Sequence, residues 1–271
     1  MISRAVRICR PLAILSAVLA LAAFTVSPAA AKSMRDITKA KVFNIGVVPF
    51  ATDVIKDPKT GEYKGVFVDA AKFICETIKV KCVFKEFSWA TFIAGLQSRQ
   101  IDLSIASTYS KMTRALVVNF SRPIYLLGYK GVAKKGENRF KSPEDLNNPD
   151  ITISVTQGTG EMEWLKKIAP KAKLRVVKTE ELTMLEVVTG KVDIGIGDSI
   201  AVNHALATQP SIKPVLGSKI YSKNMVAWAV NKEDQDILNF INTAINQIIA
   251  SGKLLELAKK YKAPWMNDLA F

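Results

Sequence analysis

The chain has 271 residues, of which 49% are hydrophobic, and a formal net charge of +14 at neutral pH. Its single histidine, His204, and three cysteines exclude a histidine-rich or cysteine-rich metal site, and we expect neither a metal nor a cofactor. The basic residues are scattered without long runs, which indicates a solvated basic surface and no nucleic-acid partner.

The first 31 residues have the three parts of a secretory signal peptide. Three arginines precede an apolar stretch at 12–26, and small residues follow at Ala29–Ala31. The apolar stretch is shorter than the roughly 20 residues that a bilayer-spanning helix needs. We therefore expect cleavage after Ala31 and a periplasmic mature protein. No cysteine stands directly after the apolar stretch, and Cys9 precedes it, so we expect no lipid anchor.

Strand and helix patterns alternate along the rest of the chain. The first group is a strand at 41–48, a helix at 65–78, a strand at 80–87, a helix at 89–98 and a strand at 101–106. The second group has strands at 151–155, 174–177 and 192–196 with helices at 161–168, 180–189 and 199–207. A strand at 225–230 and helices at 234–249 and 253–261 close the chain. This alternation predicts an α/β fold of mostly parallel sheets with helices on both faces.

Candidate binding residues follow the predicted strands. Ligands of open α/β sheets lie beyond the carboxyl ends of the strands. Residues at such positions are Pro49–Phe50, Trp89, the segment from Ser107 through Tyr109 to Arg114, Gly158–Gly160, and Asp198. The sequence therefore predicts one site at this edge.

Gly158-Thr159-Gly160 leads from a strand into a helix, where free backbone amides attract an anion such as a carboxylate. The alternative is an ordinary turn in which Thr159 caps the helix. A dinucleotide fingerprint is excluded because Glu163 stands where its third glycine would be.

Three further residues and one pair of cysteines each allow two interpretations. Arg114 is either a planar fork for a carboxylate or an exposed surface arginine. Asp198 either receives an ammonium group or caps the next helix, and Trp89 either covers a ligand or belongs to the core. Cys75 and Cys82 are either a disulfide or two free thiols.

The sequence contains no recognisable catalytic set. It lacks a Gly-x-Ser-x-Gly elbow and a Cys–His pair, and we expect His204 to lie on the surface or in a packing contact. We therefore assign no catalytic residue, although an enzyme built on carboxylates is not excluded.

Several spaced motifs resemble the family 3 solute-binding proteins, the receptors of amino-acid ABC transporters. Arg114 is followed six residues later by Phe120-Ser121-Arg122-Pro123-Ile124-Tyr125, similar to the family pattern. Further matching segments are Gly61 to Asp69, Trp89 to Asp102, Gly158-Thr159, and Gly190 to Asp198. The resemblance covers nearly all of 42–261.

This resemblance implies two lobes, each a mostly parallel sheet flanked by helices, joined by a two-strand hinge that closes over the ligand. Lobe 1 would comprise 41–130 plus 225–262, and lobe 2 would comprise 131–224. The implied function is a periplasmic receptor, expected to be a monomer. It would bind an amino acid or similar small polar solute and deliver it to the membrane subunits of an ABC transporter.

The resemblance also implies roles for individual residues. Arg114 and the amides of Thr159 and Gly160 would hold the α-carboxylate of the ligand, and Asp198 would hold its α-ammonium group. Trp89 would cover the ligand side chain, Ser107 and Tyr109 would line the first lobe, and Cys75 and Cys82 would form a disulfide.

The chain departs from the family pattern at Lys111 and Gly160, where threonine is usual, and Glu161 either reaches the ligand or caps its helix.

Two other functions are compatible with the same fold. Periplasmic cyclohexadienyl dehydratases are similar, but they have a general-acid glutamate where this chain has Ala201. A solute-sensing module acting on a separate membrane partner is the third possibility.

Overall fold

The computed structural model describes residues 31–266 and Leu269. The expected signal peptide lies outside the described residues except for Ala31, so its cleavage stays a prediction. Lys32–Phe271 forms one compact unit. Within the described part of the chain, no helix has the length and apolar character needed to cross a bilayer.

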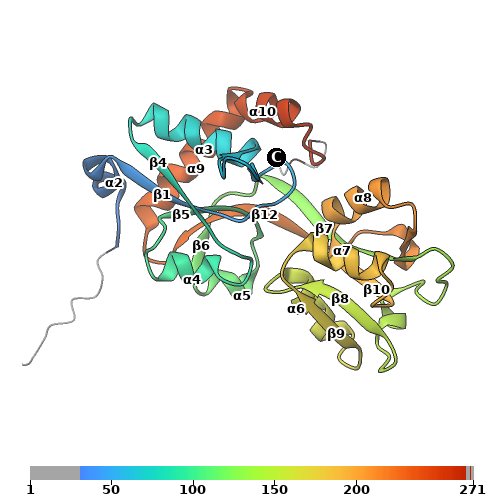
Figure 1. Ribbon diagram of the computed structural model, residues 1–271. Coiled ribbons are helices and arrows are strands. Elements are labelled where there is room, and N and C mark those ends of the chain that lie inside the picture. Colours follow the sequence, from blue (N-terminus) through green and yellow to red (C-terminus); the bar gives the residue numbers. More distant parts are fainter. Residues whose placement is uncertain (1–30, 267–268, 270–271) are drawn as a thin grey trace, which may run out of the picture. The chain divides into compact units, whose positions relative to one another are not determined.

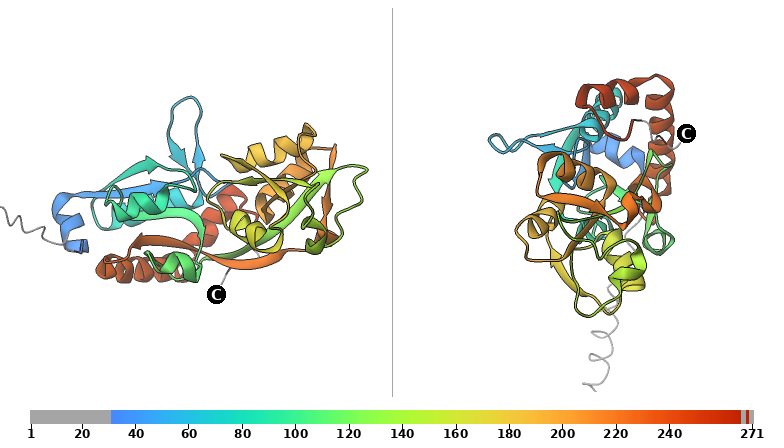
Figure 2. Two further views of the ribbon diagram at one scale, coloured as in Figure 1. Left: turned by 90° about the horizontal axis from the view of Figure 1, so that it is seen from below. Right: turned by 90° about the vertical axis from the view of Figure 1, so that its right-hand side faces the viewer.

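Ten strands form one mixed sheet and two short strands form a separate hairpin. The sheet strands are β1 (Val42–Val47), β4 (Lys81–Glu86), β5 (Leu103–Tyr109), β6 (Val118–Phe120), β7 (Tyr125–Lys134), β8 (Thr152–Thr156), β9 (Lys173–Val177), β10 (Ile194–Asp198), β11 (Ile212–Val215) and β12 (Tyr221–Asn231). The hairpin consists of β2 (Ile55–Lys56) and β3 (Tyr63–Lys64), and Figure 2 shows its tip projecting from the first half of the chain.

The sheet order β4-β1-β5-β12-β7-β10-β8-β9 divides into two parallel groups joined by two long antiparallel strands. Strands β4, β1 and β5 are parallel to one another, as are β10, β8 and β9. Strand β12 pairs with β5 in its second half and with β7 in its first half. Figure 1 shows β7 and β12 passing from one group to the other. This is the expected two-lobed α/β fold with a two-strand connection.

Helices cover both groups of strands (Figure 1). The first lobe contains α2 (Met34–Ala40), α3 (Val66–Thr77), α4 (Phe92–Gln97), α5 (Met112–Ala115), α9 (Gln235–Ala250) and α10 (Lys253–Tyr261). The second lobe contains α6 (Gly160–Ile168), α7 (Glu180–Val188), α8 (Ser199–Thr208) and the short 3-10 helices η2 (Pro143–Leu146) and η3 (Leu216–Ser218). The residue ranges expected for each lobe stay a prediction.

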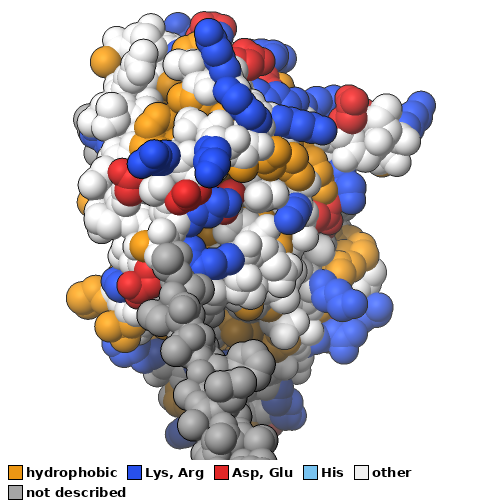
Figure 3. Space-filling view, turned by 90° about the vertical axis from the view of Figure 1, so that its left-hand side faces the viewer, with side chains coloured by type: hydrophobic (Ala, Val, Ile, Leu, Met, Phe, Trp, Pro, Cys, Tyr) orange, Lys and Arg blue, Asp and Glu red, His pale blue; other side chains and the backbone are white. Residues whose placement is uncertain are grey.

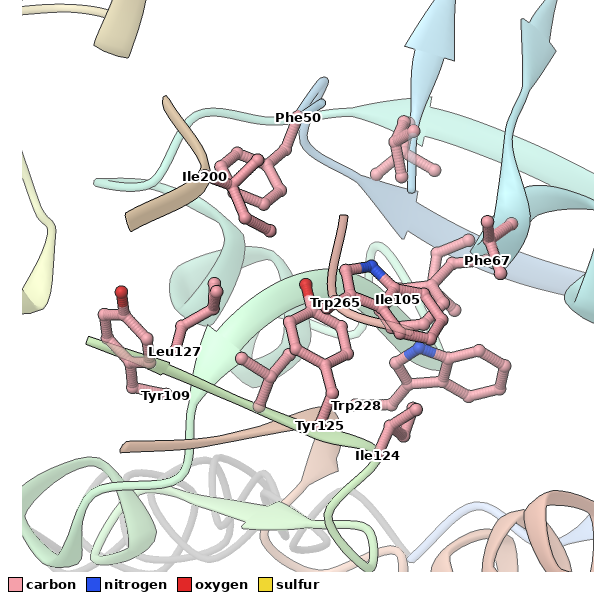
Figure 4. Packing of buried hydrophobic residues seen from close by; sticks show 14 of the residues in the cluster. Phe50, Phe67, Ile105, Tyr109, Ile124, Tyr125, Leu127, Ile200, Trp228 and Trp265 are labelled. Carbon is pink, nitrogen blue, oxygen red and sulfur yellow. The ribbon is translucent and has the colours of Figure 1, made fainter. Parts of the chain in front are cut away.

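Large aromatic side chains fill the core beneath the crossing strands. Trp265 stacks on Tyr125 with ring centroids 4.5 Å apart, and Phe67 meets Trp228 edge-on at 5.5 Å. Figure 4 shows these four rings packed together. Because Tyr125 begins β7 and Trp228 lies in β12, this packing fixes the first lobe to the two crossing strands.

A disulfide joins Cys75 in α3 to Cys82 in β4, with their Cα atoms 5.9 Å apart. The expected pairing is confirmed. The bond ties the end of a helix to the neighbouring edge strand and closes a loop with a sequence separation of 7 residues.

Basic side chains are distributed over the surface. On the face shown in Figure 3, Lys and Arg occur in several small groups with Asp and Glu among them. On this face, the distribution matches the scattered charge expected from the sequence.

Candidate functional site

One pocket lies where the carboxyl ends of the parallel strands of both lobes meet. It is lined by Phe50, Trp89, Ser107, Thr108, Tyr109, Arg114, Leu127, Thr159, Gly160, Glu161, Glu180 and Asp198. All eight residues that the sequence predicted for ligand binding are therefore brought together, although their role in holding a ligand stays a prediction. Thr108, Leu127 and Glu180 were not predicted, and Phe50 had been noted only because it follows the first strand.

Strand β5 positions two of the predicted residues. The sequence predicted a strand ending at Ala106, whereas β5 continues to Tyr109. Ser107 and Tyr109 therefore lie within the strand rather than after it, and this boundary was wrong. Polar Ser107 and Thr108 interrupt the apolar pattern although both are buried.

Arg114 is buried on the short helix α5, with 7% of its surface exposed. Its Nη1 donates to Thr108 Oγ1 at 2.8 Å, and its Nη2 donates to the Gly158 carbonyl at 3.0 Å and to Glu163 at 3.3 Å. The surface reading of Arg114 is therefore wrong. A guanidinium has five N–H donors, so donors remain for a further anion.

Thr159 caps helix α6 and lines the pocket at the same time. Its Oγ1 accepts from the Met162 amide at 3.4 Å and donates to the Thr156 carbonyl at 2.8 Å. Gly158, with φ +77°, adopts a conformation that favours glycine, and a Cβ there would lie 2.7 Å from the backbone of Ala90 in the other lobe. The turn therefore permits close approach of the two lobes.

Gly160 is the first residue of helix α6, and neighbouring atoms leave no space for a side chain at this position. A Cβ there would lie 2.5 Å from the Tyr129 hydroxyl and 2.8 Å from Lys111 Nζ. Lys111 donates to the Gly160 carbonyl at 3.3 Å and forms an ion pair with Glu163 at 3.1 Å. The two departures from the family pattern are therefore adjacent in space.

Asp198 ends β10 and caps helix α8. Its Oδ1 accepts from the amides of Ile200 at 2.7 Å and Ala201 at 3.0 Å. The capping interpretation is confirmed, and the carboxylate also lines the pocket. Burial, followed by the charge of Glu161, raises the pKa of Asp198 to about 7.

Glu161 and Glu180 add two buried carboxylates from helices α6 and α7. Glu161 accepts a hydrogen bond of 3.0 Å from the Tyr109 hydroxyl of the other lobe. Burial raises the pKa of Glu161, and burial together with the charges of Asp198 and Glu161 raises the pKa of Glu180 well above its usual value. The ionised forms of these buried carboxylates are therefore destabilised unless a cation enters the pocket.

Asp53 does not line the pocket but bonds Ser107, which does. This fully buried carboxylate accepts from Ser107 Oγ at 2.5 Å, Tyr125 Oη at 2.5 Å and Trp265 Nε1 at 2.7 Å. Burial raises the pKa of Asp53 to about 6 despite these three donors. Asp53 therefore connects the pocket residue Ser107 to the strand β7 and to the C-terminal segment.

The aromatic side chains Trp89 and Phe50 form one wall of the pocket. Trp89 is partly exposed in the loop before α4 and contacts Phe50 edge-on, with ring centroids 5.8 Å apart. Trp89 thus contacts the core and lines the pocket, which combines the two readings left open by the sequence.

The described residues contain no group of three or more His, Cys, Asp or Glu side chains that could hold a metal ion. His204 is exposed on α8.

Comparison with known proteins gives consistent matches over most of the chain. Residues 44–264 match the family model of the bacterial extracellular solute-binding proteins, family 3. The L-cystine-binding protein TcyJ of Escherichia coli K12 is 24% identical over 202 residues, which cover 74% of this chain and 75% of that protein. The lysine/arginine/ornithine-binding periplasmic protein of the same organism is 23% identical over 221 residues, covering 79% and 83%.

A similar solved structure is that of the ancestral amino acid-binding protein AncCDT-1, described as a precursor of cyclohexadienyl dehydratase. It has a TM-score of 0.76 and 27% sequence identity, and the match covers 84% of this chain and 98% of that chain.

Proposed function

Because this chain belongs to the bacterial extracellular solute-binding proteins of family 3, we propose that it is a periplasmic receptor for an amino acid or a similar small polar solute. The solute binds between the two lobes, closure of the lobes encloses it, and the receptor delivers it to the membrane subunits of an ABC importer. The receptor acts as a monomer and needs no cofactor.

The observation that carries this proposal is the pairing of opposite charges in one pocket. Arg114 lies on the first lobe and Asp198 on the second, and both side chains are more than nine-tenths buried. A zwitterion satisfies both, because its carboxylate complements a guanidinium and its ammonium group complements a carboxylate. The free amides at the start of α6 add donors for the same carboxylate.

Contacts between the lobes couple binding to closure. Arg114 donates to Gly158, and Tyr109 donates to Glu161, so residues that line the pocket also join the two lobes. A solute that contacts both lobes stabilises the closed arrangement by its differential affinity for that arrangement.

Binding without chemistry fits the site better than the dehydratase alternative. The position three residues beyond Asp198 is Ala201, which offers only its backbone amide to Asp198. The two relatives from Escherichia coli are named as binding proteins. AncCDT-1 is also named as an amino acid-binding protein, although it is a precursor of an enzyme.

Thermal unfolding of the mature protein against a panel of amino acids tests this function. The protein is first freed of copurified solute by unfolding and refolding. A solute present at 100 times its dissociation constant should stabilise the protein by about 2.7 kcal/mol. If no amino acid shifts the unfolding transition, the assignment of an amino acid as the solute is contradicted.

Substitution of Arg114 tests the site itself. Arg114→Ala should weaken binding by roughly 2–5 kcal/mol, since it removes a buried charged partner of the solute carboxylate. Arg35→Ala is the matched control, because Arg35 is exposed on α2 and does not line the pocket. Calorimetry on variants shown to be folded measures the difference, and unchanged affinity in Arg114→Ala would reject the assignment.

A further inference from the structure

The pocket contains more negative than positive charge. Its lining includes one cationic side chain, Arg114, and three carboxylates, Glu161, Glu180 and Asp198. The three acidic residues are 2%, 8% and 4% exposed, respectively. Burying a carboxylate is costly unless it has a charged or hydrogen-bonding partner. A zwitterion would pair with Arg114 and Asp198 and would leave Glu161 and Glu180 without a counter-charge.

Glu180 is the least satisfied of these groups. Its Oε2 is buried and has no hydrogen-bond partner among the described residues. The carboxylate occupies space left by a glycine, since a Cβ at Gly197 would lie 2.7 Å from this oxygen. Among the described residues, the hydrogen-bond partner of the Glu161 carboxylate is the neutral Tyr109 hydroxyl. Both carboxylates therefore have the capacity to accept from a cation.

Nearby protein cations do not fill this role. Lys111 forms its ion pair with Glu163, and Arg114 bonds Thr108, Gly158 and Glu163. Lys178 and Glu180 both line a second pocket, but within the described part of the chain no ion pair joins them. Within the described residues neither Glu161 nor Glu180 forms an ion pair, so an ion-pair partner for them is left for the solute to supply.

We propose that the solute is a basic amino acid whose side-chain cation is held by Glu161 and Glu180 while its α-ammonium group is held by Asp198. This inference rests on the receptor function proposed above and names its substrate class. An organic cation is favoured over a metal ion, because within the described residues these carboxylates form no group that could hold a metal.

Pairs of amino acids with side chains of similar shape, one cationic and one neutral, test the inference. L-Arginine is compared with L-citrulline, and L-lysine with L-norleucine, by calorimetry at pH 8. The cationic member of a pair should bind at least about 30-fold more tightly, as expected for a buried charge pair. Equal affinity within both pairs, or preference for the neutral member, would overturn the inference.

Adjacent glutamates provide a matched pair of variants. Glu180→Gln should lower the ratio of cationic to neutral affinity by about tenfold or more, whereas Glu181→Gln should leave it unchanged. Glu181 is exposed and does not line the pocket. Glu161→Gln should act like Glu180→Gln, and thermal unfolding verifies that each variant is folded. An unchanged ratio in both pocket variants would reject these residues as the cation site.

The outcomes separate this inference from the proposed function. Binding of neutral amino acids alone would overturn the inference and leave the receptor function standing. Putrescine, a diamine without a carboxylate, serves as the third probe. Binding of putrescine without any amino acid would support the cation site and contradict the amino-acid receptor. Binding of none of these probes would overturn the inference, and the receptor function would then be decided by the full amino-acid panel described above.

Discussion

Acidification should weaken solute binding, because Asp198 must be ionised to hold an ammonium group. Burial and the charge of Glu161 raise the pKa of Asp198 to about 7. If the bound cation keeps this carboxylate ionised, protonation competes with binding. The apparent dissociation constant should then rise about 2-fold at pH 7, about 10-fold at pH 6 and about 100-fold at pH 5, relative to its plateau above pH 8.

Other titratable groups interact with Asp198 through their charges. Burial also raises the pKa of Glu161 and of Glu180, so protonation of either would weaken binding of a cation further. Asp53, whose pKa is raised to about 6, acts on Asp198 through its charge. The pKa of Tyr109 is raised well above its usual value, so its hydroxyl remains neutral.

The stability of the solute-free protein should change with the opposite sign. The folded-state pKa of Asp198 lies above the value of about 4 in an unfolded chain, so the folded state binds the extra proton between these values. Its contribution to the free energy of unfolding is therefore greatest at or below pH 4 and is lost as pH rises through 7. Asp53 contributes in the same direction up to about pH 6.

Calorimetric titrations from pH 5 to 8, with thermal unfolding of the solute-free protein in the same buffers, measure both effects. Asp198→Asn should weaken binding and remove most of its pH dependence. Affinity that is constant over this range, or that increases at pH 5, would refute the assignment of Asp198 as the ionised partner of an ammonium group.

Two further substitutions and the reduction of the disulfide probe the scaffold around the pocket. Asp53→Ala should lower the free energy of unfolding by about 2–5 kcal/mol in urea denaturation, since three buried donors lose their acceptor; a loss below 1 kcal/mol would show that the network is unimportant. Reducing the Cys75–Cys82 disulfide should cost about 2.5 kcal/mol, as estimated for a loop of this length, and leave affinity unchanged. Two free thiols detected by mass spectrometry of the secreted protein would contradict that bond. Gly158→Ala should weaken binding about tenfold or more in calorimetry, because its Cβ would meet Ala90 across the lobes, and wild-type affinity would argue against close approach there.

Periodicity and strand-end positions predicted most of the fold and seven of the eight expected site residues that meet in the pocket, whereas Glu161 was named only in the comparison with the family pattern. Sequence patterns predicted the structure correctly where it depends on neighbouring residues, as for Thr159 between β8 and α6. It failed at β7, a crossing strand for which no separate strand was predicted, and at the end of β5, where buried Ser107 and Thr108 resemble the start of a loop.

Two buried carboxylates could not be recognised from the sequence. Glu180 and Glu181 look alike, because acidic residues are favoured in the first turn of any helix. Only the tertiary structure shows that Glu180 is buried and Glu181 exposed. Asp53 lies in a turn-rich segment, and its partner Trp265 is 212 residues away in the chain. No local signal links such a pair.

Calorimetric titration of the solute-free mature protein with each of the twenty amino acids is the most direct test of the receptor function. We expect one solute molecule to bind per chain, with the tightest binding from a basic amino acid. Absence of binding heat with every amino acid, together with an unchanged unfolding temperature, would contradict the account.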